Sequence, residues 1–228
     1  MNAALTGRAR DANAGLASDR IRERMVDRVR ELGVRDERVL AAVDSVPRHA
    51  FVDAALASRA YEDCALPIGE GQTISQPYIV ARCAELALAG IADPRAATVL
   101  EIGTGCGYAA AVLARIFGAV YSIERIKTLH QLSRERLRPL RLPNLHLLAG
   151  DGTDGYAEAA PYDAIVVAAA ASAVPESWLA QLKPDARIVA PVGDTDQRLI
   201  VIQRDAGGRV HRRNVEPVRF VPLKSGVV

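Results

Sequence analysis

The sequence predicts an α/β fold: a doubly wound, mostly parallel Rossmann-like sheet, with an N-terminal helical segment before it and a C-terminal antiparallel hairpin at its end. Three observations carry this prediction. From about residue 97 onward, short apolar runs of strand length alternate with stretches of helical periodicity, as in βαβ units. Glycines follow the first of these runs directly. The last two apolar runs are joined through Gly207-Gly208, which favours a hairpin at an antiparallel edge.

Composition sets limits on the class of protein. The chain has 228 residues, half of them hydrophobic, and a formal net charge of +2, which is typical of a globular domain. We expect a loose tail over 1–17 and a single domain over 18–228. The balanced charge gives no reason to expect a nucleic-acid partner. Without a run of about 18 apolar residues or a signal-peptide pattern, the sequence predicts a cytoplasmic protein with no membrane partner.

Cysteine and histidine spacing argues against a metal site and against a disulfide framework. The three cysteines are scattered and odd in number, without CxxC spacing, and the four histidines lie far apart without an HExxH motif. We therefore expect neither a bound metal nor a structural disulfide. The residues concerned are Cys64, Cys83 and Cys106, and His49, His130, His146 and His211.

The region before the sheet is predicted to be mostly helical. Apolar residues recur every three or four positions from Ser18, the expected cap, to Gly33, the expected end. A second helix is expected over 36–46, and a short helical or loop segment over 46–52. The stretch 61–75, interrupted by proline and glycine, is expected to form strand fragments and loops.

The next elements lead into the sheet. Pro77 precedes a helical pattern that ends at Gly90, and a proline is tolerated near a helix start because its missing N–H costs little there. After this helix, the expected strands are 97–103, 119–124, 144–152, 162–170 and 186–193, the expected helices are 108–118, 126–138 and 175–182, and the expected hairpin strands are 198–205 and 209–220.

A glycine-rich loop marks the expected ligand site. Gly103, Gly105 and Gly107 form a G-x-G-x-G motif between a predicted strand and a predicted helix. Glycines at such a place allow a sharp turn and a close approach of the backbone to a ligand. Glu124 closes the next strand, and an acid about 20 residues after the loop can hydrogen-bond a ribose diol. The pattern therefore predicts a nucleotide-like ligand at the carboxyl ends of the strands.

Two details of the loop favour one kind of cofactor. The third glycine comes one residue too early for the dinucleotide pattern. Glu101, two residues before Gly103, would repel a pyrophosphate but suits a cationic cofactor such as S-adenosylmethionine. Asp151, in a GDG sequence after the third strand, is placed to face an adenine edge. Together these features predict a class I methyltransferase fold; the alternatives are an NAD site and glycines that serve only helix packing.

Several segments resemble one family, the protein-L-isoaspartate O-methyltransferases. The resemblance extends from about residue 20 to 223, and the motif GQTISQP is its most specific part. The segments that carry it are YEDCALPIGEGQTISQPYIVA, VLEIGTGCGYAAAVLA, YSIERIK, AGDG, PYDAIVVAAAA, LKPDARIVAPVG and VEPVRFVPL.

The resemblance implies a reaction and a substrate. In this family S-adenosyl-L-methionine methylates the free α-carboxylate of an isoaspartyl residue, and the ester then cyclises to a succinimide whose hydrolysis returns some normal aspartate. The implied partners are damaged proteins and peptides that contain isoaspartate. It also implies that 18–75 form a helical and substrate-loop region and 76–228 a cofactor-binding core. The lack of heptads or a large apolar stripe favours a monomer.

The resemblance also implies roles for single residues. Ser75 matches the family's active-site serine, and Gln72 and Thr73 belong to the same strip beside cofactor and substrate. Judged from the residues alone, Ser75 is a candidate N-cap of the following helix, and one hydroxyl can serve both purposes. Taken together, the loop pattern and the resemblance predict these cofactor contacts: Gln72, Thr73, Ser75, Glu101, Gly103, Thr104, Gly105, Gly107, Glu124, Asp151 and Gly152.

The implied chemistry needs no general base. A carboxylate with a pKa near 4 is ionised at neutral pH, and the sequence has no Cys-His or Ser-His-Asp constellation. We therefore expect Ser75 to align the carboxylate rather than to act as a covalent nucleophile. Cys106 stands where the family often has serine, and Ala168 where bacterial relatives often have threonine. The alternatives are a class I methyltransferase acting on another carboxylate or small molecule, and a non-catalytic cofactor-binding module.

Overall fold

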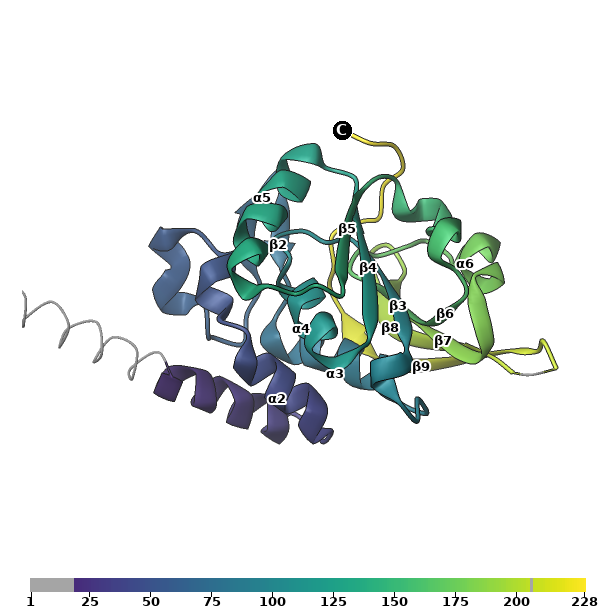
Figure 1. Cartoon of the computed structure of the whole chain (residues 1–228), viewed down its shortest axis with the longest axis horizontal. Coiled ribbons are helices and arrows are strands. Elements are labelled where there is room, and N and C mark those ends of the chain that lie inside the picture. Colours follow the sequence, from purple (N-terminus) through teal and green to yellow (C-terminus); the bar gives the residue numbers. More distant parts are fainter. Residues whose placement is uncertain (1–18, 206) are drawn as a thin grey trace, which may run out of the picture.

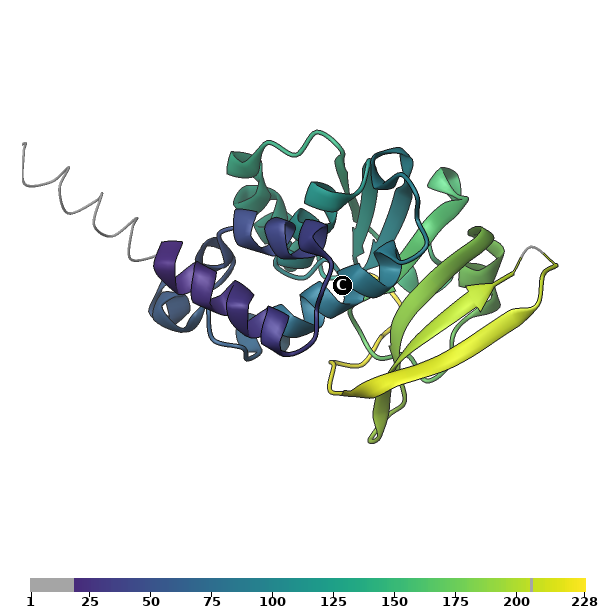
Figure 2. The same cartoon turned by 90° about the horizontal axis from the view of Figure 1, so that it is seen from below.

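The computed structural model describes residues 19–205 and 207–228, which form a mixed sheet with helices packed on both sides (Figure 1). The expected tail over 1–17 and the expected cap Ser18 lie outside these described residues. Figure 2 shows the N-terminal helices at one end of the molecule and the hairpin of the last two strands at the other.

Seven strands form the central sheet in the order β5-β4-β3-β6-β7-β8-β9. The first five run parallel to one another, and the last two are antiparallel. This order confirms the predicted α/β class and the antiparallel hairpin at one edge. The strands are β3 (Thr98–Ile102), β4 (Ala119–Glu124), β5 (Leu145–Ala149), β6 (Tyr162–Val167), β7 (Leu182–Val192), β8 (Gln197–Arg204) and β9 (Val210–Val218).

The register of β3 places the functional loops at one edge of the sheet. Ile102, the last residue of β3, pairs with Ile123 of β4 on one side and with Val167 of β6 on the other. The chain passes from β3 outward to β4 and β5, and then returns to β6 on the opposite side of β3. Such a reversal of strand order opens a crevice at the carboxyl ends of the strands, where α/β proteins bind ligands.

Two apolar cores lie on the two faces of the sheet. Successive residues of a strand point to opposite faces; Val99 belongs to one core, while Leu100 and Ile102 belong to the other. The helices α3, α4 and α5 cover the first face, and α6 covers the second with Trp178, which is fully buried. The helices are α3 (Pro77–Leu88), α4 (Tyr108–Ile116), α5 (Lys127–Leu137) and α6 (Glu176–Ala180).

Two helices precede this core. The first covers 19–31 and the second is α2 (Glu37–Ser45), which packs against α3 and α4. Asp36 caps α2, because its carboxylate accepts a hydrogen bond from the backbone N–H of Arg38. Among the described residues, no helix has both the length and the apolar character needed to cross a bilayer. Short 3₁₀ turns are η1 (Arg48–Phe51), η2 (Ala54–Arg59), η3 (Pro94–Ala96), η4 (Arg138–Leu140), η5 (Gly152–Asp154) and η6 (Ala157–Ala159).

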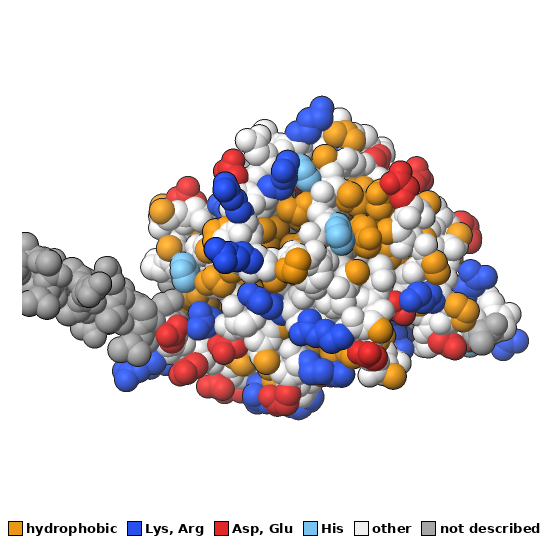
Figure 3. Space-filling view, viewed as in Figure 1, with side chains coloured by type: hydrophobic (Ala, Val, Ile, Leu, Met, Phe, Trp, Pro, Cys, Tyr) orange, Lys and Arg blue, Asp and Glu red, His pale blue; other side chains and the backbone are white. Residues whose placement is uncertain are grey.

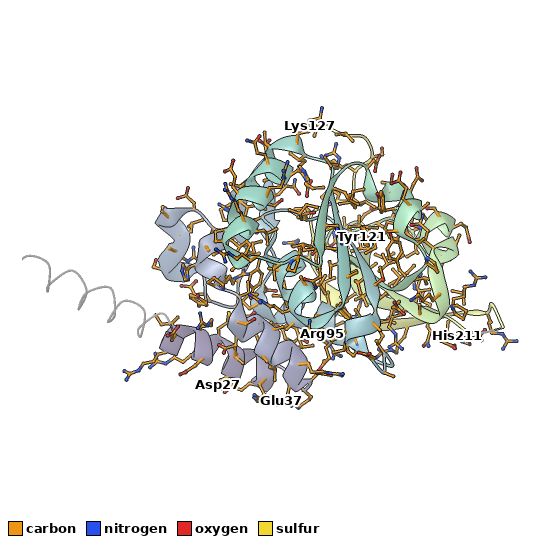
Figure 4. All side chains as sticks on the ribbon, viewed as in Figure 1. Asp27, Glu37, Arg95, Tyr121, Lys127 and His211 are labelled. Atoms are coloured by element: carbon orange, nitrogen blue, oxygen red, sulfur yellow. The ribbon has the colours of Figure 1, made fainter. Side chains whose placement is uncertain are left out.

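The charges of the N-terminal helices face solvent in mixed pairs. Arg28 pairs with Glu31 at 3.2 Å, and Arg30 pairs with Glu37. Acidic and basic side chains alternate along this lower rim of the molecule (Figure 3), and Asp27 and Glu37 point away from the sheet (Figure 4). Exposed pairs of this kind contribute little to stability, so this surface is a solvated helix face.

One strand begins earlier than the sequence predicts. We expected the strand before the hairpin to start at residue 186, but β7 begins at Leu182. Pro184 and Asp185 favour a turn, and Asp185 indeed has a φ of 62°. The sheet accommodates both residues as an irregularity in the pairing with β6.

Candidate active site

A small antiparallel hairpin lies across the glycine loop. It consists of β1 (Leu66–Gly69) and β2 (Gln72–Ile74), joined by Glu70 and Gly71, which both have positive φ as in a tight two-residue turn. A Cβ built on Gly105 would lie 3.3 Å from Ile68 Cδ1, so the hairpin rests directly on the loop. At its tip, Glu70 Oε1 accepts a hydrogen bond from Thr128 Oγ1 of α5 at 2.9 Å.

Ser75 follows β2 and directly precedes α3. The expectation that it caps this helix is wrong, because the N-cap residue is Gln76 and α3 begins at Pro77. Asp63 satisfies the first free backbone donor instead, since its Oδ1 accepts from the N–H of Tyr78 at 3.0 Å. Gln76 Nε2 in turn donates to the carbonyl of Asp63 at 3.0 Å. Ser75 is therefore left to line the cavity described below.

The three glycines of the loop have different surroundings. All have positive φ: 98° for Gly103, 54° for Gly105 and 93° for Gly107. A Cβ on Gly103 would lie 3.4 Å from Ala168 Cβ, across the crevice between β3 and β6. A Cβ on Gly107 would lie 2.7 Å from Leu137 Cδ1. The last glycine thus allows α5 to pack closely on the start of α4.

Both glycine N–H groups at the start of the loop are already engaged. The N–H of Gly103 donates to the carbonyl of Ile123 at 2.9 Å, and the N–H of Gly105 donates to Glu124 Oε2 at 2.8 Å. A pyrophosphate would need free N–H groups at this turn. This bonding pattern disfavours a dinucleotide and fits a ligand without phosphate.

Glu124 is fixed at the end of β4. Its second oxygen, Oε1, accepts from the N–H of Ile126 at 2.9 Å, so the carboxylate bridges the glycine loop and the turn after β4. The side chain is buried apart from 5% of its surface and lines the cavity. A bridged carboxylate of this kind is held in place for a hydrogen bond to a diol.

Glu101 is fully buried beneath the glycine loop. Ser122 Oγ donates to Glu101 Oε2, and the Ser122 and Thr104 hydroxyls are 2.6 Å apart. Glu101 Oε1 has no partner within 19–205 and 207–228. Burial, with a smaller contribution from the nearby Glu124, raises the pKa of Glu101 to about 8.

The last residues of the chain form a C-terminal strap, which we define as 224–228. Arg125 Nε donates to the carbonyl of Gly226 at 2.7 Å. The N–H of Val228 donates to the carbonyl of Arg125 at 3.0 Å, and the N–H of Lys127 donates to the carbonyl of Val228 at 2.8 Å. Lys127 lies at the top of Figure 4, where the chain ends in Figure 1. The strap therefore follows the turn that holds Glu124.

Asp151 is bonded to the same strap. Its Oδ1 accepts from the N–H and the hydroxyl of Thr153, and its Oδ2 accepts from the N–H of Gly226. Burial alone would raise the pKa of Asp151, but these hydrogen bonds lower it overall. In the structure the Asp151 carboxylate anchors the strap. Its expected contact with an adenine edge stays a prediction.

The loop, hairpin and strap surround one cavity, the main pocket. It spans about 860 Å³, counted out through its open mouth into solvent. Of the residues predicted to bind the cofactor, only Glu101, Gly107 and Asp151 do not line it. Those that do are Gln72, Thr73, Ser75, Gly103, Thr104, Gly105, Glu124 and Gly152.

Part of the pocket wall was missed by the sequence analysis. Val221 to Lys224 line it, although no role was expected for them. Their placement depends on the segment after β6, since the N–H of Ala170 donates to the carbonyl of Val221 at 2.8 Å and the N–H of Leu223 donates to the carbonyl of Ala170 at 2.7 Å. The only signal in the sequence was the motif VEPVRFVPL.

A second hollow, the side groove, opens beside the main pocket. The two share Thr73, Ser75, Ala168 and Val221, so Ser75 lies at the junction of two binding spaces. The side groove is lined by Ala65, Thr73, Ser75, Gln76, Ile79, Ala168, Pro217, Val218, Arg219, Phe220 and Val221.

The lining offers little for acid–base or metal chemistry. No histidine lines either hollow, and Cys106 is a buried thiol whose pKa is raised by burial. His49 is exposed and bonded to the Tyr61 hydroxyl at 2.7 Å. In the described part of the chain, no three His, Cys, Asp or Glu side chains are grouped to hold a metal. The site can bind and align two ligands.

The fold and the site define a class of protein: a Rossmann-like methyltransferase that uses S-adenosylmethionine. The model of the family "Protein-L-isoaspartate(D-aspartate) O-methyltransferase (PCMT)" matches residues 20–228. The chain belongs to this family, as the sequence analysis expected.

Individual relatives agree with this assignment. A protein of Bordetella avium is 55% identical over 221 residues, which cover 96% of this chain and 82% of the relative. A protein of Ralstonia nicotianae is 52% identical, covering 99% of this chain and 75% of the relative. Both are named protein-L-isoaspartate O-methyltransferase.

Solved structures share the architecture. One named protein-L-isoaspartate O-methyltransferase superposes with a TM-score of 0.81 at 28% identity, covering 90% of this chain and 67% of that chain. A Plasmodium falciparum protein, solved with S-adenosyl-L-homocysteine, has a TM-score of 0.77 at 24% identity and covers 89% of this chain and 98% of that one. The second likeness bears on the fold alone.

Proposed function

We propose that this protein transfers a methyl group from S-adenosylmethionine to the free α-carboxylate of L-isoaspartyl residues in damaged proteins and peptides. The observation that carries the proposal is the position of Ser75. It comes from the family motif GQTISQP and lies where the main pocket meets the side groove. One hollow serves the methyl donor and the other the peptide.

The main pocket fits S-adenosylmethionine on three grounds. Glu124 offers a fixed carboxylate for a ribose diol. Ile102, Ile123 and Leu223 add apolar wall for an adenosine. The N–H groups of Gly103 and Gly105 are bonded within the protein and are not offered to a phosphate, which this cofactor lacks. When bound, it supplies a methyl group on a positively charged sulfur, ready for transfer to a nucleophile.

The residues of the chain have a positioning task. The substrate carboxylate is already ionised at neutral pH, which agrees with a lining whose one carboxylate, Glu124, is already bonded to two backbone N–H groups. We propose that the Ser75 hydroxyl donates a hydrogen bond to this carboxylate and directs one oxygen toward the methyl group. A neutral hydrogen bond contributes only about 1 kcal/mol, but alignment of two bound reactants can lower a barrier by up to about 7–11 kcal/mol.

The product ester starts a repair pathway in this proposal. Cyclisation to a succinimide needs no further group of the protein, and hydrolysis of the ring returns part of the material to normal aspartate. We further propose that residues 18–228 work as one domain and as a monomer, since one chain supplies the lining of both hollows. A cytoplasmic location stays a prediction of the sequence.

The test is methyl transfer from labelled S-adenosylmethionine to a synthetic isoaspartyl peptide, with the matched aspartyl peptide as control. We expect base-labile label on the isoaspartyl peptide alone. Equal label on both peptides would show a less selective carboxyl methyltransferase. No label on either, with cofactor binding intact, would direct the search to other acceptors and refute the proposed substrate.

A further inference from the structure

The side groove carries a single charged side chain. Its lining is apolar or neutral apart from Arg219, which follows the end of β9 and is exposed. A guanidinium is charged under all ordinary conditions. A peptide lying in the side groove therefore meets one fixed positive charge.

Carboxylates on neighbouring segments are engaged elsewhere. Glu216 of β9 accepts from the Tyr78 hydroxyl at 3.0 Å and lies 3.5 Å from Arg82 Nε. Asp63 accepts from the backbone N–H of Tyr78. Within 19–205 and 207–228, Arg219 takes part in none of the ion pairs. Its charge is free for a ligand.

Arg219 lies where the side groove would hold the peptide residues that flank the reacting isoaspartate. It stands two residues before Val221, which belongs to the junction with the main pocket, and it does not line the main pocket itself. Extended backbone advances about 3.3 Å per residue. The charge thus lies within reach of a peptide side chain one or two positions from the junction.

The reacting carboxylate is a poor partner for this arginine. Methyl transfer joins an anion to a cation, so the transition state carries less charge than the bound reactants. An ion pair to the carboxylate would stabilise the reactants more than the transition state and would slow the reaction. A neutral donor such as Ser75 at the junction, with the cation set apart from it, avoids this penalty.

We infer that Arg219 is a specificity residue that favours isoaspartyl substrates with an acidic side chain one or two positions from the isoaspartate. The inference rests on the proposed function, because it concerns the acceptor of that reaction. The Arg219 side chain contributes to peptide binding and not to the methyl-transfer step. Exposed ion pairs change an equilibrium constant by up to about fivefold and weaken with salt.

The experiment compares isoaspartyl peptides that differ only in the flanking residue. Glutamate, alanine or lysine is placed one or two positions away on either side, and kcat and KM are measured at low and high salt. The proteins are the wild type, Arg219→Gln, Arg219→Lys and the control Arg212→Gln. Arg212 is also exposed on the last hairpin but does not line the side groove.

We expect KM for the best-placed glutamate peptide to be about three- to fivefold lower than for its lysine counterpart at low salt, with similar kcat. Arg219→Gln should remove this preference, while Arg219→Lys and Arg212→Gln should keep it. An unchanged preference in Arg219→Gln, or none in the wild type, would overturn the inference and leave the proposed function standing. Failure to methylate any isoaspartyl peptide would overturn both.

Discussion

At the scale of single residues, the buried carboxyl of Glu101 links the stability of the fold to pH. Burial raises its pKa from 4.5 to about 8. Between these values the unfolded chain loses the proton while the folded protein keeps it. Stability is therefore greatest below pH 4.5 and falls as the pH rises toward 8.

Replacing Glu101 with glutamine should remove this dependence. One pKa unit corresponds to about 1.4 kcal/mol, so the pH-dependent part is on the order of a few kcal/mol. Urea unfolding of both proteins from pH 5 to 8.5 checks the prediction: wild type should lose stability relative to Glu101→Gln as the pH rises. Parallel stability curves would show that Glu101 is ionised in the folded state.

The Ser75 hydroxyl gives a second prediction at this scale. Ser75→Ala should lower kcat about tenfold, from the lost hydrogen bond and poorer alignment, while cofactor affinity changes less than twofold. Turnover assays and calorimetry with S-adenosylmethionine measure the two effects. Ser177→Ala is a suitable control, because this buried hydroxyl in α6 has no partner within the described residues. Unchanged turnover would remove Ser75 from the mechanism.

Residue-scale predictions from sequence agree with the lining of the main pocket where the signal is local, while the contacts of these residues with a cofactor stay a prediction. The spacing of Gly103, Gly105 and Glu124 placed all three at the main pocket. The cap of α3 was assigned wrongly to Ser75, because the group that satisfies the helix start is Asp63. The β1–β2 hairpin separates Asp63 from α3 along the sequence, and only the folded hairpin brings the two together. A pattern of neighbouring residues cannot show such a contact.

At the scale of elements, the glycine loop divides into a part that faces the ligand and a part that packs helices. Gly107→Ala should destabilise the fold by about 2–4 kcal/mol, from left-handed backbone strain and overpacking against Leu137. Gly105→Ala should cost less stability, since the added methyl meets only the flexible tip of Ile68. It should instead weaken cofactor binding about tenfold, because it narrows the main pocket.

Thermal unfolding and cofactor titration of the two variants distinguish these effects. We expect Gly107→Ala to show the larger fall in melting temperature and Gly105→Ala the larger loss of affinity for the cofactor. The reverse ranking would mean that the third glycine, and not the second, contacts the cofactor.

The elements themselves were largely predictable. Apolar runs gave the strands of the parallel core to within a few residues, because strands buried on both faces are continuously apolar. The start of β7 was missed, since Pro184 and Asp185 have the composition of a turn. Only the pairing with β6 on either side of them, at Leu182 and Arg187, keeps them in the strand.

At the scale of the whole molecule, the C-terminal strap joins distant parts of the chain. Arg125 and Gly226 are bonded although 101 positions separate them. Deleting residues 225–228 should lower cofactor affinity about tenfold, because the turn that orients Glu124 loses its bonds to the strap. The unfolding temperature of the cofactor-free protein should change little, since these residues are exposed.

Calorimetry on the shortened protein measures the affinity, and the single replacement Lys224→Gln in the full-length chain tests separately the one charged side chain of the strap. Equal affinity of the full and shortened chains would show that Glu124 is held by the glycine loop alone. Sequence patterns could not reveal this strap, because on its own side every bond to residues 125 and 127 uses a backbone group that any residue carries.

Two short segments of the chain supply most of the residues that line the side groove. Apart from Ala168, its lining comes from residues 65–79 and 217–221, which lie outside the run of parallel strands. The main pocket shares Thr73, Ser75, Ala168 and Val221 with the side groove and adds the loops after β3 and β4. Acceptor choice can thus diverge in evolution at the side-groove residues that the main pocket does not share, while the loops that receive the methyl donor are inherited unchanged.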